Sequence, residues 1–358
     1  MGREIRAAII GAGRISIAHA EGYMSSTDAK LIAVSDIVRE KAKTLATRYG
    51  AEWTTDYLEI LKRPDIDVVS ICTPNELHAQ MAIDAAEAGK HIICEKPMAM
   101  SLTEADAVIA AVRKNGTKFT VDFTLRYSLP LVYVKNICDE GVIGKIRTVR
   151  THWRGPLPIS PIVSDWYIDP RRSGGLLFDR LCHDADLVRW FTGKEVKSIY
   201  AQGSATRFVE YRERYGESFV DSATISLDLD DNILCNTDIS YIGSDQPQFM
   251  RVEILGSTGS LISDPMKHDL IAIFSETGKN GAEWVPEWTC PRGWSSITPQ
   301  GRPVSPKPFH IELIKEFVNC VKEDKGPPIS VEDGRASLEI TIGARESIEQ
   351  GVRIRLPL

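Results

Sequence analysis

The first 123 residues alternate short apolar runs with segments of helical length, and this alternation constrains the fold more than any other feature. The runs are residues 7–10, 31–35, 68–72, 91–94 and 119–121. Between them lie segments such as 76–90, whose apolar residues recur at helical spacing. Strands that are apolar throughout and alternate with helices are typical of a parallel sheet covered on both faces. The chain is therefore expected to begin with an α/β domain.

Length and composition limit the remaining possibilities. A chain of 358 residues exceeds the usual size of a single core, so two domains are expected. The net charge of −6 and the absence of Lys/Arg runs argue against nucleic acid or a membrane surface as a partner. The seven cysteines form no CxxC, and no signal peptide or membrane-spanning run stands out, which predicts a cytoplasmic protein. No cluster with metal-ligand spacing is visible either, so no metal is expected.

A glycine-containing loop, GAGRIS at residues 11–16, follows the first apolar run. Gly11 and Gly13 suit a tight turn and the close approach of backbone N–H groups to a pyrophosphate. Asp36 ends the second run, 23 residues after Gly13, near the spacing of a carboxylate that accepts ribose hydroxyls. The pattern predicts a dinucleotide site, and the carboxylate favours NAD over NADP because it would repel a 2′-phosphate. Arg39 nearby weakens that preference.

A second loop follows the 68–72 run, at the strand end where ligands of such sheets bind. It begins Thr73, Pro74, Asn75, which reads as a turn and helix cap and is also placed to touch a cofactor. His78 lies at the start of the next helical segment. It is either a polar residue of the helix face or a further cofactor contact.

A third strand end carries an acid and a base. The run 91–94 stops abruptly at Glu95, Lys96 and Pro97. A buried charge is costly unless it is paired, so charged residues at the end of a core strand require a reason. One reading is a solvated lysine paired with Glu95. The other is a lysine aimed by the proline at a substrate oxygen near the nicotinamide, where it would stabilise developing negative charge.

Together these motifs resemble a known family. "GAGRIS", "CTPNELH" and "AGKHIICEKP" look like the glucose–fructose oxidoreductase / inositol dehydrogenase (Gfo/Idh/MocA) family, in which the lysine matching Lys96 reaches the substrate hydroxyl. Residues 166–193 are similar to the D-x-G-x-H-x-x-D motif of that family, with Leu181 in place of its glycine. The cofactor-binding residues expected on this basis are Gly11, Gly13, Arg14, Ile15, Asp36, Thr73, Pro74, Asn75, His78, Glu95 and Lys96.

The second motif has a physical reading of its own. Asp179, His183, Asp186 and Trp190 follow one another at spacings of four, three and four residues, which places them on one face of a predicted helix ending near Phe191. An Asp–His pair four residues apart on a helix is usually a surface contact. The apolar residues beside this one instead suggest a helix face that lines a cleft. A histidine suits proton abstraction near neutral pH.

The resemblance assigns roles to this motif. It implies His183 as the catalytic base, Asp179 as a catalytic residue that binds substrate or tunes the base, and Asp186 as an orienting partner. Arg126 and Trp166 are further candidates on the substrate side.

The rest of the chain predicts strands at 145–153, 223–229, 232–241 and 251–261, and helices at 308–324 and 331–351. The expected fold is thus α/β plus α+β. An N-terminal Rossmann dinucleotide-binding domain, 1–123, precedes a domain with an open, mainly antiparallel sheet, 124–358, for substrate binding and oligomerisation. The resemblance implies a homo-oligomer, a dimer or tetramer.

A segment rich in tryptophan and proline, 283–309, is expected to form a long stiffened loop. Trp284, Trp288 and Trp294 lie within it. They are expected either to cover the substrate cleft or to pack against the sheet or a subunit contact.

These observations predict an NAD-dependent dehydrogenase that oxidises a secondary hydroxyl of a sugar, polyol, cyclitol or glycoside. Two rivals remain. An NAD-dependent glycosidase would oxidise its sugar transiently and eliminate the aglycone. A catalytically silent NAD(H)-binding sensor would bind the cofactor without turnover.

Overall fold

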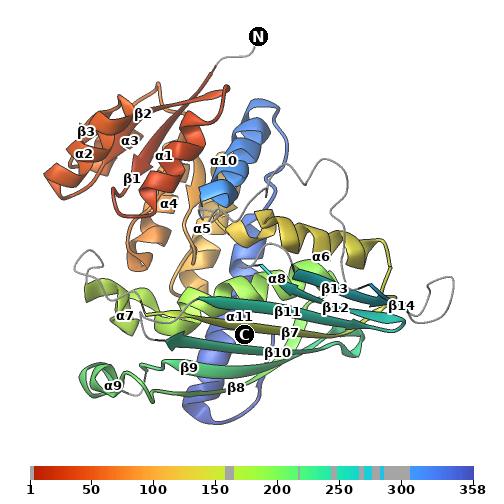
Figure 1. The fold of residues 1–358 in the computed structure, drawn as a ribbon. Coiled ribbons are helices and arrows are strands. Elements are labelled where there is room, and N and C mark those ends of the chain that lie inside the picture. Colours follow the sequence, from red (N-terminus) through yellow and green to blue (C-terminus); the bar gives the residue numbers. More distant parts are fainter. Residues whose placement is uncertain are drawn as a thin grey trace. The chain divides into compact units, whose positions relative to one another are not determined.

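The computed structural model describes residues 4–157, 165–216, 218–242, 248–265, 270–275, 283–285 and 307–358. The chain divides into two compact units, which are drawn together in Figure 1. Unit 1 comprises Met1–Thr124 and Val304–Leu338, and unit 2 comprises Leu125–Pro303 and Glu339–Leu358. This differs from the expected division into 1–123 and 124–358, because a segment near the C-terminus returns to the first unit.

Unit 1 is built on a six-stranded sheet in which every pair of neighbouring strands is parallel. Its order is β3-β2-β1-β4-β5-β6, so the strand order reverses between β1 and β4, where ligands of such sheets bind. All five predicted strands are present, and the three-residue edge strand β3 was missed. The bounds are β1 Ile5–Ile10, β2 Ala29–Ser35, β3 Glu52–Thr54, β4 Val68–Ile71, β5 His91–Cys94 and β6 Phe119–Val121.

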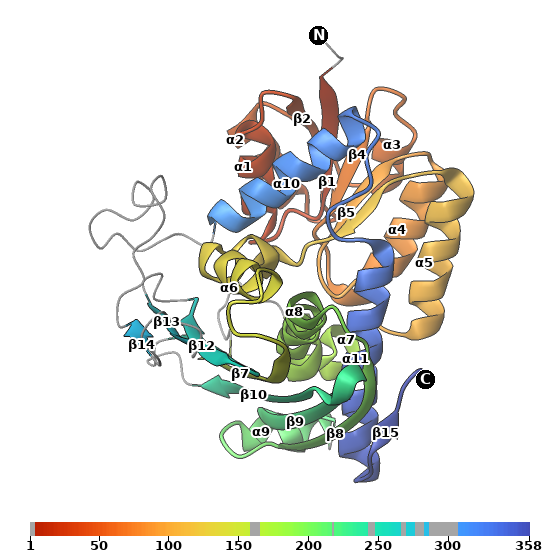
Figure 2. The same cartoon turned by 90° about the vertical axis from the view of Figure 1, so that its right-hand side faces the viewer.

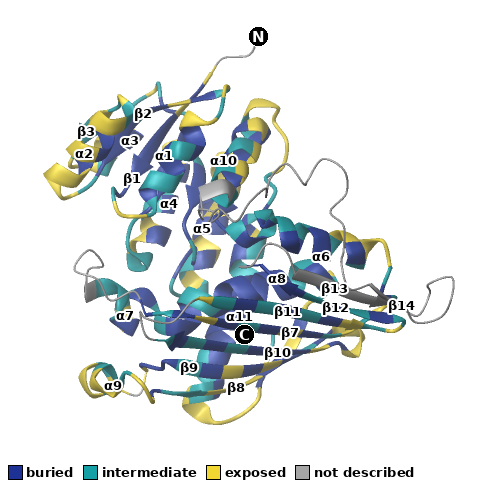
Figure 3. Ribbon diagram, viewed as in Figure 1, coloured by how far each residue is buried: buried dark blue, intermediate teal, exposed yellow. Residues whose placement is uncertain are grey.

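The helices of unit 1 cover a sheet whose central strands are buried, as Figure 3 shows. Helix α10 comes from the returning segment and lies beside α1 in both views of Figures 1 and 2. The two helices approach closely at Gly22, where an added Cβ would lie 2.5 Å from Ile314 Cδ1. The bounds are α1 Ser16–Met24, α2 Arg39–Tyr49, α3 Tyr57–Leu61, α4 His78–Glu87, α5 Leu102–Asn115 and α10 Lys307–Lys322.

Unit 2 is built on a nine-stranded sheet in the order β14-β13-β12-β11-β7-β10-β9-β8-β15. Only β7 and β10 pair in parallel among its described strands, so the predicted mainly antiparallel sheet is confirmed. The bounds are β7 Ile146–Pro156, β8 Val196–Ser204, β9 Ser222–Leu229, β10 Leu234–Ile242, β11 Phe249–Gly256, β12 Gly259–Asp264, β13 Leu270–Ser275, β14 Glu283–Val285 and β15 Ile354–Arg355.

Among the described residues, unit 2 contains five α- or π-helical segments, together with α11, in which the boundary between the units falls. They are α6 Leu129–Asp139, α7 Pro170–Ser173, a π-helical turn Leu177–Leu181, α8 Cys182–Thr192, α9 Val209–Tyr215 and α11 Val331–Gln350. Glu283–Val285 forms strand β14 instead of the start of the expected loop, and α10 already begins at Lys307. The rest of that loop, with Trp288 and Trp294, lies outside the described residues, as does the side chain of Trp284.

Among the described residues, no helix is both long enough and apolar enough to cross a bilayer.

Candidate active site

The glycine loop of unit 1 joins β1 to α1 and fits a pyrophosphate. Gly11 has φ +97°, and a Cβ there would lie 2.6 Å from the Cys72 carbonyl oxygen, so only glycine is tolerated. No atom lies within 4 Å of the place that a Cβ on Gly13 would take. The loop thus leaves room in front of the α1 N-terminus, where backbone N–H groups favour an anion. Arg14 is exposed and Ile15 is partly exposed beside it.

Asp36 lies at the end of β2. Its side chain is partly exposed and also forms hydrogen bonds with the glycine loop. Its Oδ2 accepts a hydrogen bond from Ala12 N–H at 2.7 Å, and its Oδ1 accepts one from Val38 N–H at 2.8 Å. Each carboxylate oxygen can accept a second bond, so capacity for ribose hydroxyls remains. The guanidinium of Arg39 lies 5.2 Å from the centre of the Trp53 ring. This contact gives Arg39 an aromatic neighbour, and the preference for NAD over NADP stays a prediction.

Thr73, Pro74 and Asn75 follow β4 as predicted and are partly exposed. His78 is fully buried and lies between two main-chain oxygens, with Nδ1 2.7 Å from Pro97 O and Nε2 2.9 Å from Thr73 O. Burial lowers the pKa of His78, so the ring is neutral and donates to one oxygen at a time. We interpret His78 as a positioning residue that links the Thr73 loop to the Lys96–Pro97 segment, in place of the cofactor contact considered above.

Lys96 follows β5 on the carboxyl edge of the sheet, the same edge that carries the glycine loop after β1. Glu95 is buried, and its Oε1 lies 3.2 Å from Nε2 of His19. The other oxygen, Oε2, accepts from Lys96 N–H at 3.3 Å. Glu95 therefore turns inward toward His19, and cofactor contact by Glu95 stays a prediction.

In unit 2, the second motif does not form the single regular α-helix that the sequence predicted. Leu177–Leu181 is a π-helical turn, and α8 begins only at Cys182. A π turn holds one more residue than an α turn, so Asp179 is not placed one regular α-turn before His183. Such turns are frequent at functional sites.

Asp179 lies in a polar cluster of unit 2. It accepts a hydrogen bond from Tyr241 Oη at 3.3 Å, and Nε of Arg180 lies 3.1 Å from its Oδ2. Burial and the Asp179 carboxylate raise the pKa of both Tyr241 and Tyr167 well above the usual range. Both phenols therefore keep their protons and can act as donors. Trp166 is partly exposed and meets the Tyr167 ring edge-on at 5.5 Å.

His183 lies on α8 and is 7% exposed. Its ring is tilted by 49° against Trp153 of β7, with ring centres 5.4 Å apart. The indole fixes one side of the imidazole, so the direction of the ring nitrogens is set by packing.

Arg126 and Asp186 form a buried ion pair in unit 2. Arg126 Nε donates to Asp186 Oδ2 at 2.9 Å, and Nη2 donates to Oδ1 at 2.6 Å. The guanidinium also lies 5.9 Å from the centre of the Trp190 ring. This two-point geometry gives Arg126 a structural partner that sequence reasoning did not foresee. Substrate contact by Arg126 stays a prediction.

Asp184 is the residue that sequence reasoning missed. Its side chain is fully buried on α8, and neither carboxylate oxygen has a hydrogen-bond partner by geometry. Burial raises the pKa of Asp184 to about 7, although Thr151 and Arg180 act in the opposite direction. Its position next to His183 in the sequence gave no signal, because burial depends on what packs against α8.

This pKa makes stability depend on pH. The unfolded chain releases the proton of Asp184 near pH 4 and the folded chain near pH 7, so the folded state binds more protons between these values. Stability contributed by protonated Asp184 is thus lost as pH rises through this window. Asp184→Asn, which mimics the protonated form, should gain about 2 kcal/mol of stability relative to the parent between roughly pH 5.5 and pH 8.

Urea unfolding of the parent and of Asp184→Asn at both pH values measures this gain. Asp139→Asn, at an exposed position on α6, serves as the control. A stability difference that is the same at both pH values would contradict the assignment.

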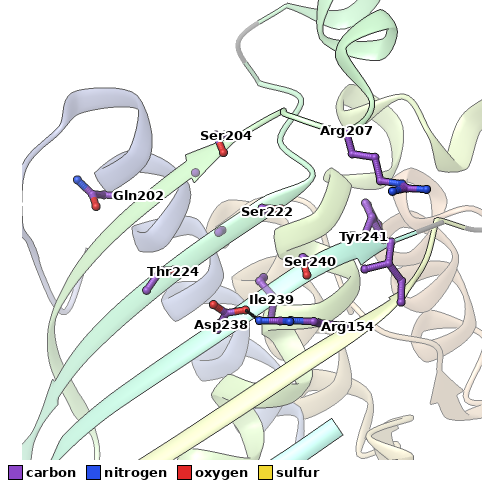
Figure 4. A pocket seen from close by; sticks show the side chains of 13 residues that line it. Arg154, Gln202, Ser204, Arg207, Ser222, Thr224, Asp238, Ile239, Ser240 and Tyr241 are labelled. Carbon is purple, nitrogen blue, oxygen red and sulfur yellow. Dashed lines mark ion pairs between the residues drawn. The ribbon is translucent and has the colours of Figure 1, made fainter. Parts of the chain in front are cut away.

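A hollow in the described part of unit 2 lies elsewhere, on a face of the large sheet. It is a shallow cavity of about 510 Å³, lined by β7, β8, β9 and β10. Figure 4 shows its polar lining, where the Arg154 guanidinium faces the Asp238 carboxylate at 3.9 Å. His183 and Asp179 do not line it, so this cavity does not mark the candidate chemistry.

A parallel sheet of this order, with a glycine loop and an acidic residue at the next strand end, defines a dinucleotide-binding protein. A model of the "oxidoreductase family, NAD-binding Rossmann fold" matches residues 5–123, and one of the "GFO/IDH/MocA C-terminal domain" matches residues 131–262. The chain belongs to the GFO/IDH/MocA oxidoreductase family, and its cofactor is NAD.

Individual relatives support this family assignment. The inositol 2-dehydrogenase of Rhizobium meliloti is 33% identical over 279 residues, 76% of this chain and 80% of that protein. The myo-inositol 2-dehydrogenase of Thermotoga maritima is 29% identical over 357 residues, 98% of each chain. A solved structure of levoglucosan dehydrogenase in complex with NADH and levoglucosan has a TM-score of 0.87 and 25% identity, over 99% of this chain and 100% of that one.

Proposed function

We propose that the protein is an NAD-dependent dehydrogenase that oxidises a secondary hydroxyl of a cyclitol or sugar. The observation that carries the proposal is the carboxyl edge of the unit 1 sheet. There a loop that fits a pyrophosphate follows β1, and Lys96 follows β5. The names of the relatives, inositol and levoglucosan dehydrogenases, support this substrate class.

Two side chains share the proton and charge chemistry in this proposal. Bound nicotinamide would accept a hydride from the carbon that carries the hydroxyl. His183 takes the hydroxyl proton, and the packing of its ring against Trp153 supports a fixed orientation of the imidazole. The ammonium of Lys96 stabilises the negative charge that develops on oxygen. Asp179 holds substrate hydroxyls or tunes His183, with Tyr167 and Tyr241 as its neighbours.

A substrate panel tests the proposal. Purified protein is incubated with NAD and with inositol isomers, aldoses, anhydrosugars and aryl glycosides, and NADH absorbance is followed. Steady NADH formation with a cyclitol or sugar is expected. Release of aglycone without accumulation of NADH would instead identify an NAD-dependent glycosidase. NADH binding without turnover of any compound would identify a sensor.

The choice between NAD and NADP follows from Asp36. Catalytic efficiency with NAD should exceed that with NADP by at least about tenfold, since the carboxylate repels a 2′-phosphate. Asp36→Ser should narrow this gap. It also removes the acceptors of Ala12 and Val38 N–H, so efficiency with NAD should fall as well.

Steady-state kinetics with both cofactors measure these effects. Asp56→Ser, which changes a helix-capping aspartate elsewhere in unit 1, is the control and should keep the parent ratio. Equal efficiency of the parent protein with both cofactors would refute the role of Asp36.

A further inference from the structure

Four ionisable side chains meet inside unit 1. His19 lies on α1, Glu95 follows β5, Asp122 follows β6, and His310 lies on α10. His19 is fully buried, Asp122 is 2% exposed and Glu95 is 8% exposed. Two carboxylates and two imidazoles are the donor types that bind transition-metal ions.

The spacing of the donor atoms matches a shared central ion. Nε2 of His19 lies 3.2 Å from Glu95 Oε1 and 3.2 Å from Asp122 Oδ2, and these three donors lie within 4.8 Å of one another. Nε2 of His310 lies 3.3 Å from Asp122 Oδ2 and 4.0 Å from Glu95 Oε1. Ligands bound to zinc at tetrahedral geometry are about 3.3 Å apart, since each bond is about 2.0 Å.

A hydrogen-bonded network explains these contacts less well. Nε2 of His19 is equidistant from two oxygens but carries at most one proton. Nε2 of His19 and Oε1 of Glu95 form a hydrogen bond of 3.2 Å, and all four distances exceed the about 2.7–2.9 Å that is usual for charge-assisted N–H···O bonds. Neither oxygen of Asp122 accepts a hydrogen bond of acceptable geometry, although this carboxylate is almost fully buried and directed into the cluster.

The surroundings of His19 also suit a metal ligand. Its second ring nitrogen, Nδ1, lies 3.0 Å from Ser70 Oγ, and Ser70 Oγ lies 2.7 Å from Tyr23 Oη. Metal-binding histidines usually donate their other N–H to a fixed partner, which orients the ring. Ser70 and Tyr23 supply that partner and direct Nε2 at the two carboxylates.

We propose that His19, Glu95 and Asp122 bind a divalent transition-metal ion of the zinc class, with His310 as the fourth ligand. Two positive charges balance the two buried carboxylates when both imidazoles are neutral. The ion joins α1, α10 and the ends of β5 and β6, so it fastens the returning helix α10 to the sheet. The site goes beyond the proposed dehydrogenase chemistry and does not depend on it.

Metal analysis tests the proposal on the full-length protein, freed of any affinity tag. The protein is treated with a chelator, dialysed to equilibrium against micromolar zinc chloride and analysed by plasma mass spectrometry. About one zinc ion per chain is expected, together with a higher melting temperature in zinc than in chelator. Replacement by Co²⁺ should give the visible absorption bands of a tetrahedral N/O site.

Variants locate the ion. Asp122→Asn and His19→Gln should abolish zinc binding, and His310→Gln should weaken it by about tenfold or more. His152→Gln, in strand β7 of unit 2, is the matched control and should bind as the parent does. His310 lies at the outer side of the cluster, so His310→Gln remains informative if the variants at buried positions fail to fold.

Two results would overturn the proposal. One is a parent protein that binds no zinc under these conditions and melts at the same temperature in zinc and in chelator. The other is zinc binding that persists at full strength in folded Asp122→Asn or His310→Gln, which would place the ion elsewhere.

Discussion

Replacing Lys96 with methionine, or His183 with alanine, should lower kcat by about a hundredfold or more. This is the size of effect that positioned electrostatic groups and general bases provide. Methionine keeps most of the length of the lysine side chain but carries no charge. NADH affinity should stay nearly unchanged, since neither residue is assigned to the phosphates. Turnover of the best substrate and fluorescence titration with NADH measure the two quantities.

The controls are chosen from exposed or unrelated positions of the same residue types. Lys62→Met, at an exposed position of unit 1, and His152→Ala, in β7, should keep the parent turnover. Because His183 is buried against Trp153, His183→Gln is added as a variant that preserves more of the packing. If either Lys96→Met or His183→Ala retains most of its turnover while binding NADH normally, the role given to that residue is wrong. If both residues act on the same step, the double variant should lower kcat by less than the product of the fold reductions of the two single variants.

Arg126→Met should destabilise the protein by about 3–5 kcal/mol, because it removes the guanidinium that neutralises the buried Asp186 carboxylate. The Asp186 side chain is 1% exposed and that of Arg126 is 13% exposed, so water cannot replace the lost ion pair. Removing both charges in Arg126→Met/Asp186→Leu should restore much of the stability, since the buried carboxylate is then absent as well. Urea unfolding of the three variants measures these differences.

Further variants at Arg126 distinguish a structural role of this residue from a role in substrate binding. If Arg126 mainly bound substrate, Arg126→Lys would raise KM strongly with little change in stability. If it mainly neutralises Asp186, Arg126→Lys should lower stability, because lysine cannot form the two-point contact. A matched control is Arg113→Met, which breaks the exposed pair with Glu332 and should cost less than about 1 kcal/mol.

The fold could be predicted from the sequence where burial leaves a clear pattern. Strands buried on both faces read as uninterrupted apolar runs, and all five predicted strands of unit 1 are present for that reason. Strand β3 is only three residues long and includes an exposed glutamate, Glu52, so it left no such run. The sequence did not predict that α10 packs in unit 1. Its amphipathic pattern shows that one face of the helix is buried, but it does not show which element covers that face.

The candidate site was predictable to a similar extent. Motifs local in sequence, the glycine loop and the Glu95-Lys96-Pro97 strand end, were identified from spacing and chain position. The partners of His78, Arg126 and Asp184 were not, because each depends on segments far away along the chain. The cluster at His19 joins residues separated by as many as 291 positions, from 19 to 310, so no local spacing could reveal it.

The two-piece construction of unit 1 has a consequence for how the protein is made. On a ribosome, residues 1–124 emerge long before residues 307–322, yet α1 packs on α10 so closely that Gly22 allows no side chain beside Ile314. Until residues 307–322 have been synthesised and have left the ribosome, the nascent first unit must expose the apolar surface that α10 later covers. This delay creates a period in which chaperones have an apolar surface to bind.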